Sequence, residues 1–222
     1  MDRFFIPSRT PEDWLGVHAG TGTTWRDGSA AEPLARAWQE ANGFPSAVQR
    51  VLDASGEDAL QGLEMLAAFP EYELPLLGDD GPSTSDLFVL AKGKRGLVSV
   101  MVEGTATGAF GPMVCEWLVE GARTKMRLLT QLCDVLGADI GEIQSARYRL
   151  FLQAAGALVV AERFEAPTAL MVVHSFAGTD EGFRDYSLFC RLFSAAAVAD
   201  GVIEAHRTQI RRLFFSWVRG AD

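Results

Sequence analysis

The chain has 222 residues, 48% of them hydrophobic, and its net charge is −9 from 29 acidic and 20 basic side chains. The length and the apolar content suit one large folded domain. The negative charge argues against broad nonspecific attraction to nucleic acid, because phosphate binding depends on cationic side chains. We find no apolar stretch near the roughly 18 residues of a membrane span and no signal-peptide core at the amino terminus. We therefore expect a cytoplasmic protein without a membrane partner.

The three cysteines, Cys115, Cys133 and Cys190, are widely spaced. An odd number at such spacings indicates neither a disulfide framework nor a zinc site. We expect reduced thiols, most of them buried.

The first quarter of the chain is expected to be helical. Pro11 after Thr10 is typical of a helix start and predicts a short helix over residues 11–17. Apolar residues at helical spacing predict further helices over residues 30–41, from Pro45, and after Gly56. We expect a single domain over residues 1–222, in which a helical lobe of residues 1–56 packs on a core of residues 57–222.

A β-hairpin is predicted within residues 82–110. Two apolar runs, residues 87–91 and 97–102, flank a turn-like Gly-Lys-Arg-Gly sequence at 93–96. If that four-residue loop joins the strands, Lys92 faces Leu97. In an antiparallel pair, each step back along the first strand is then matched by one step forward along the second.

This register sets Asp86 opposite Glu103. Opposed residues on one face of a sheet have Cβ atoms roughly 4.5–5.5 Å apart, and like charges there are destabilising. A divalent cation would remove the repulsion, because carboxylates are ligands that such ions prefer.

The other expected elements alternate between strands and helices. A long apolar run such as residues 169–176 is typical of a central strand that is covered on both faces. In chain order these elements are a strand at 71–77, a helix at 116–136 broken near Gly121, the longest helix at 139–164, the strand at 169–176, a helix after Asp180, and a strand at 212–218. The order predicts an α/β fold with a mixed central β-sheet flanked by helices.

Several short blocks resemble an uncharacterised bacterial family, a domain of unknown function within the PD-(D/E)XK nuclease-like superfamily. The blocks are PEDW (11–14), PSTSD (82–86), FGP (110–112), EWL (116–118), VVHSF (172–176) and SWVRG (216–220). The resemblance implies a restriction-endonuclease-like αβββαβ core with a helical N-terminal extension. It also implies a metal-dependent nuclease that cleaves DNA or RNA with Mg²⁺ or Mn²⁺ held by Asp86 and Glu103. Whether the chain forms a homodimer stays an open alternative.

The third residue of the superfamily's motif is missing here. Glu103 and Gly104 match its acidic residue and spacer, but Thr105 stands where a lysine would stabilise charge on the reacting phosphate. Lys92 lies roughly 20 Å along the strand from Asp86 and cannot replace it. Lys125, at the start of a helix after the hairpin, is the substitute we expect, with Arg123 and Arg127 as weaker ones.

Ordinary structural roles compete with each of these assignments. Asp86 is equally well explained as a turn or cap residue, and Lys125 as a surface lysine. Glu64 is either a third acidic ligand or an exposed helix residue, and His174 is best explained as a hydrogen-bonded core histidine.

Two functions therefore stay open. One is a divalent-metal-dependent phosphodiesterase with a degenerate active site formed by Asp86, Glu103 and Lys125. The other is a catalytically inactive binding or assembly protein that keeps the nuclease-like fold.

Overall fold

The computed structural model describes residues 3–4, 8–16, 25, 27–76, 83–107, 110–119, 122–179, 181–207 and 211–220. Its strands are β1 (Glu64–Glu73), β2 (Thr84–Gly93), β3 (Gly96–Thr105), β4 (Thr168–Ser175), β5 (Gly201–Arg207) and β6 (Arg212–Arg219). They form one sheet in the order β1-β2-β3-β4-β6-β5, in which β3, β4 and β6 are parallel neighbours and the other pairs are antiparallel. The expected α/β fold with a mixed sheet is confirmed.

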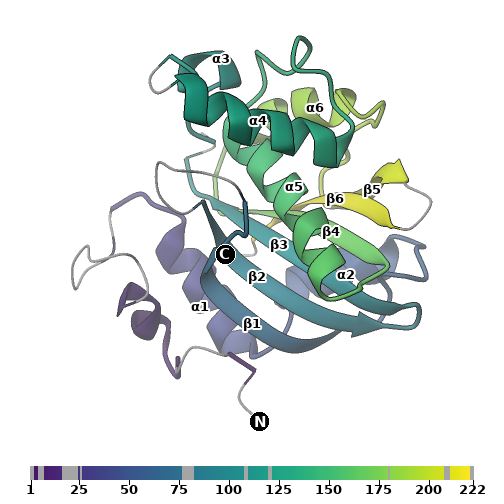
Figure 1. Cartoon of the computed structure of the whole chain (residues 1–222). Coiled ribbons are helices and arrows are strands. Elements are labelled where there is room, and N and C mark those ends of the chain that lie inside the picture. Colours follow the sequence, from purple (N-terminus) through teal and green to yellow (C-terminus); the bar gives the residue numbers. More distant parts are fainter. Residues whose placement is uncertain are drawn as a thin grey trace.

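Helices cover both faces of the sheet (Figure 1). They are the 3₁₀ helix η1 (Pro11–Gly16), α1 (Ala31–Ala41), α2 (Ser46–Ala54), α3 (Val114–Trp117), α4 (Ala122–Leu136), α5 (Tyr148–Arg163) and α6 (Glu181–Arg191). Successive residues of a strand point to opposite faces. Val102 and Val172 therefore pack with η1, α1 and α2, while Met101 and Val173 pack with α4, α5 and α6.

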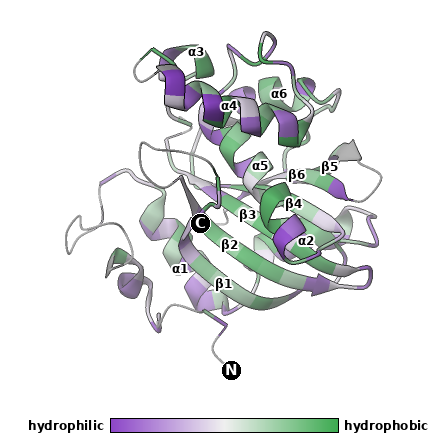
Figure 2. Ribbon diagram, in the orientation of Figure 1, coloured by the Kyte–Doolittle hydropathy of each residue, from purple (hydrophilic) through white to green (hydrophobic). Residues whose placement is uncertain are grey.

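Apolar side chains fill the two layers between the sheet and its helices. Figure 2 shows hydrophobic residues concentrated in the central strands and in α5. All eight residues of β4 are buried, as expected of a strand covered on both faces. No helix in the described part of the chain is long and apolar enough to cross a bilayer.

The hairpin register is the predicted one. Lys92 pairs with Leu97, and the register continues without a shift to Leu87 opposite Val102. The next residues in this register are Asp86 and Glu103. The turn length alone was enough to place them.

The N-terminal part of the predicted secondary structure needs two corrections, the first being that the strand expected at residues 71–77 is β1, which spans Glu64–Glu73. The fourth helix, expected after Gly56, is wrong: residues 57–62 form turns, and β1 begins at Glu64. An irregularity between Met65 and Ala67 in the pairing of β1 with β2 interrupts the alternation of buried residues. Leu63, Leu66 and Ala67 have the spacing of a helix in the sequence, but Leu63 precedes β1 and Leu66 is exposed on it.

Two differences occur later in the chain. The longest described helix, α5, begins at Tyr148 rather than at residue 139. Asp139 instead accepts a hydrogen bond from the Gly141 N–H at 2.6 Å, which holds a turn. The edge strand β5 was not predicted. The expected break in the segment 116–136 is confirmed, since it contains two helices, α3 and α4. Gly121 itself lies outside the described residues, as does Asp180 before α6.

The cysteines are free, as expected from their spacing. Cys133 and Cys190 are buried, whereas Cys115 is exposed.

Candidate functional site

Three carboxylates come together on adjacent strands. Asp86 of β2 and Glu103 of β3 are neighbours in the hairpin register. Pro70 faces Leu87 and Tyr72 faces Ser85, so Glu71 of β1 lies opposite Asp86 on its other side. The result is a row of three acidic residues across β1, β2 and β3.

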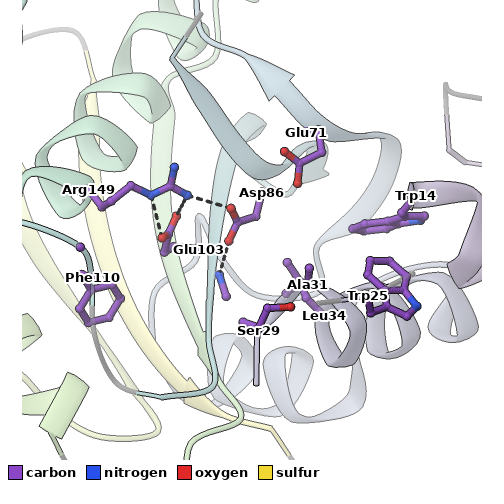
Figure 3. Close-up of a pocket in the computed structure, with 13 residues that line it drawn as sticks. Trp14, Trp25, Ser29, Ala31, Leu34, Glu71, Asp86, Glu103, Phe110 and Arg149 are labelled. Carbon is purple, nitrogen blue, oxygen red and sulfur yellow. Dashed lines mark hydrogen bonds and ion pairs between the residues drawn. The ribbon is translucent and has the colours of Figure 1, made fainter. Parts of the chain in front are cut away.

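Arg149, in the first turn of α5, lies between two of these carboxylates (Figure 3). Its Nε donates to Glu103 Oε1 at 2.9 Å. Its Nη2 donates both to Glu103 Oε2 at 2.5 Å and to Asp86 Oδ1 at 2.8 Å. A guanidinium that bridges two carboxylates in this way removes the repulsion that the sequence predicted between them.

The remaining carboxylate oxygens also have donors. Gln153, one turn after Arg149, donates from Nε2 to Glu103 Oε2 at 2.8 Å. The Gly104 N–H donates to Asp86 Oδ2 at 2.8 Å. All four oxygens of Asp86 and Glu103 therefore accept a hydrogen bond from the protein itself.

These groups border a pocket of about 340 Å³ between the end of the sheet and the start of α1. Figure 3 shows Glu71 on the same side as Asp86, with the indole rings of Trp14 and Trp25 across from Arg149. The lining residues are Trp14, Trp25, Ser29, Ala30, Ala31, Leu34, Glu71, Asp86, Glu103, Gly104, Phe110, Gly111 and Arg149.

Two backbone features shape the pocket. A Cβ atom on Gly104 would lie 3.1 Å from Ala30 Cβ and 3.5 Å from Asp86 Oδ2, so glycine lets the start of α1 approach the carboxylates. Glu71 has φ of 50°, a left-handed conformation that is unfavourable for a residue with a Cβ. Such conformations persist where surrounding structure imposes them and are frequent at binding sites.

Burial raises the pKa of both glutamates. The pKa of Glu71 rises to about 8 through loss of hydration and through the neighbouring Asp86 charge, with Arg149 opposing. Burial likewise raises the pKa of Glu103 to about 7, again against the attraction of Arg149. A cation that entered the pocket would therefore displace protons from these carboxyl groups.

Lys125 contacts Trp117 instead of the carboxylates. Its Nζ donates to the Trp117 carbonyl at 2.9 Å and lies 5.3 Å from the centre of that indole ring. Lys125 does not line the pocket. The side chain that supplies positive charge to Asp86 and Glu103 is Arg149.

Two other positions discussed from the sequence do not line the pocket either. Glu64 is an exposed strand residue whose Oε1 pairs with Arg3 at 3.4 Å. Thr105, at the position of the missing lysine, is buried at the end of β3 beside Ser175 of β4.

His174 is the hydrogen-bonded core histidine that was expected. It is 1% exposed, and its Nδ1 accepts a hydrogen bond from Trp38 Nε1 at 3.1 Å. Burial lowers its pKa to about 4.

We therefore expect His174 to make the protein acid-sensitive. Between pH 6.5 and pH 4 the unfolded chain takes up a proton on His174 and the folded chain does not, so folding loses about 3 kcal/mol as the pH falls. Urea unfolding at pH 4.5, 5.5 and 6.5 should give a smaller acid loss for His174→Gln than for the wild type. Identical pH dependence in the two proteins would contradict this assignment.

Sequence reasoning missed Arg149, Gln153 and Glu71. A signal was present for the first two, because they are polar residues four apart on a helix that is otherwise strongly apolar, and such residues share one face. Glu71 gave no such signal, since its place depends on the pairing of β1 with β2.

Comparison with protein families adds one assignment. Residues 7–222 match the family described as domain of unknown function DUF6946. The chain belongs to this family. The match assigns no activity and does not connect the chain to the PD-(D/E)XK superfamily, so that resemblance stays a prediction. Searches of curated proteins and of solved structures gave no match.

Proposed function

We propose that this chain is a binding protein without hydrolytic activity, in which Arg149 takes the place that a metal ion would need. The supporting observation is the double contact of one guanidinium with Asp86 and Glu103. The pocket beside it has the size of a small-molecule site, with apolar walls and a few convergent polar groups.

The carboxylates do not fit a divalent ion while Arg149 is in place. Metal binding needs carboxylate lone pairs that face the ion, and each oxygen of Asp86 and Glu103 already accepts a hydrogen bond. Within the described residues, no group of three or more acidic, histidine or cysteine side chains is arranged to hold a metal. We derive no hydrolytic step through such an ion.

The charge of the pocket also disfavours a phosphodiester. Three carboxylates and one arginine line it, and the donors of that arginine are directed at Glu103, Asp86 and the Thr84 carbonyl. Among the described lining residues, a phosphate would therefore meet more acidic than basic side chains. Repulsion between like charges is stronger where water is excluded.

The metal-dependent phosphodiesterase is the second candidate. The adjacency of Asp86 and Glu103 favours it, since paired carboxylates are the donor set that Mg²⁺ and Mn²⁺ use. It requires Arg149 to leave the carboxylates before an ion enters.

A cleavage assay distinguishes the two candidates. The full chain is incubated with millimolar Mn²⁺ and with plasmid DNA, single-stranded DNA and RNA in turn. We expect no cleavage above the level of Asp86→Asn. Cleavage by the wild type that Asp86→Asn and Glu103→Gln abolish, while the exposed control Glu64→Gln retains it, would overturn the proposal.

A further inference from the structure

We infer that the pocket beside Arg149 binds an uncharged small molecule in which an apolar body carries a hydrogen-bond acceptor, such as a carbonyl oxygen. The acceptor is held by the indole N–H of Trp25 and the hydroxyl of Ser29. This inference rests on the proposed non-catalytic binding function and names its ligand class.

The first support is a pair of polar groups in the pocket wall. Trp25 Nε1 and Ser29 Oγ are buried, and neither has a hydrogen-bond partner in the described part of the chain. Both residues line the pocket. Buried polar atoms normally have partners, and an indole N–H can only donate. The group that Trp25 lacks is therefore an acceptor.

The hydroxyl of Ser29 fits the same ligand, because it can donate to a carbonyl oxygen that also accepts from Trp25. Both polar atoms are covered by neighbouring atoms in the structure, so the two side chains turn toward the ligand as it binds. Ser29 does so by moving between staggered χ1 rotamers. Trp25 is only partly buried, which leaves its side chain room to turn.

The second support is that the charged groups of the wall already have partners. Arg149 donates to Glu103 and Asp86, and the Gly104 N–H donates to the second oxygen of Asp86. Glu71 also has an interaction partner within the protein. None of these side chains needs a ligand's charge, and burial of an unpaired ion beside them would cost hydration energy. An uncharged ligand avoids that cost.

The third support is the apolar surface that remains for the body of the ligand. Leu34, Phe110 and the indole rings of Trp14 and Trp25 supply it. The two rings lie across the pocket from Arg149 (Figure 3). Trp14 is fixed in place, since its Nε1 donates to Gln39 Oε1 at 2.9 Å. Apolar and aromatic walls with a few placed polar groups are the usual composition of a small-molecule site.

The size of the pocket limits the ligand. About 340 Å³ is near the lower end of the range for small-molecule sites. It suits a single ring with a short polar substituent rather than a nucleotide or an extended peptide.

Isothermal titration calorimetry of the full chain at pH 7.5 tests the inference with four probes of similar shape. Acetophenone carries a carbonyl acceptor, ethylbenzene carries none, benzoate is an anion and benzylammonium is a cation. We expect acetophenone to bind. The two ions should bind at least about tenfold more weakly, because each must lose hydration without gaining a free partner.

Variants locate the bound acceptor. Trp25→Phe keeps an aromatic ring but removes the N–H, and Ser29→Ala removes the hydroxyl. Each should weaken acetophenone binding about three- to tenfold more than ethylbenzene binding, the value of one uncharged hydrogen bond. Trp117→Phe is the matched control, since Trp117 stacks on Tyr148 and does not line the pocket. It should bind both probes like the wild type.

Each other outcome has a defined meaning. Circular dichroism shows whether each variant is folded, and Ser29→Ala decides the outcome if Trp25→Phe is not. Absence of acetophenone binding, a preference for either ion, or equal losses for acetophenone and ethylbenzene in the folded variants would overturn the inference while leaving a non-catalytic protein. Metal-dependent cleavage in the separate nuclease assay would instead overturn the proposed function.

Discussion

Replacing Arg149 with methionine is expected to lower the free energy of unfolding at pH 7.5 by about 3–5 kcal/mol, the usual cost of removing one partner of a buried ion pair. The Glu103 side chain is only 7% exposed and would keep a single charge-neutral donor, Gln153. Asp86 would lose the same guanidinium. Urea unfolding followed by circular dichroism measures the loss. Arg149→Lys keeps the charge but not the forked geometry, so its free energy of unfolding should lie between those of the wild type and Arg149→Met.

The loss in Arg149→Met should shrink as the pH falls to 5.5, because Glu103 can then take up a proton. Arg163→Met is the matched control: it removes an exposed arginine from the last turn of the same helix, where we expect a change below about 1 kcal/mol. Equal effects of the two substitutions would show that Arg149 does not neutralise the carboxylates.

Glu71→Gln is expected to stabilise the protein at high pH. The folded-state pKa of Glu71, about 8, is raised above its ordinary value of 4.5. The protonated Glu71 carboxyl group therefore makes its full contribution to the free energy of unfolding below pH 4.5, and this contribution is lost as the pH rises through 8. Such a displacement corresponds to about 5 kcal/mol for a fully buried group, and part exposure of Glu71 reduces it to about 2 kcal/mol.

Glutamine cannot ionise, so the gain should appear at pH 9 and vanish near pH 5. Thermal and urea unfolding at both pH values measure it. Glu64→Gln should show no comparable pH-dependent gain, since Glu64 is exposed. A loss of stability in Glu71→Gln at pH 9 would mean that ionised Glu71 is well solvated or already paired with a cation.

A gain of stability in Glu71→Gln would be informative in itself. Core substitutions that remove binding usually destabilise a protein. A residue that costs stability without ligand and supports binding is typical of a functional site. Glu71 joins a raised pKa to an unfavourable φ of 50°, so two independent costs meet at one position.

The features that sequence analysis predicted correctly depend on local information. The Gly93–Gly96 turn fixes the hairpin register within a few residues, and that register brings Asp86 opposite Glu103. The uniform apolar run of β4 identifies a strand buried on both faces. Neither inference needs knowledge of a distant segment.

The part of the site that was missed depends on distant contacts. Arg149 reaches Asp86 across 63 positions and Glu103 across 46. Its role therefore follows from how α5 crosses the sheet. Lys125 was chosen because it is a cation soon after the hairpin, but its Nζ is held by the Trp117 carbonyl. Proximity in sequence was a poor guide to proximity in space.

Titration of Mn²⁺ into the metal-free full chain at pH 7.5 is the most direct test of whether Arg149 replaces a metal ion. Calorimetry of the wild type should show no binding that depends on Asp86 or Glu103. Arg149→Met, if folded, should bind Mn²⁺ more tightly than the wild type, since removing the guanidinium frees oxygens of Asp86 and Glu103. Wild-type binding that Asp86→Asn and Glu103→Gln both abolish would contradict the replacement and restore the metal-dependent site.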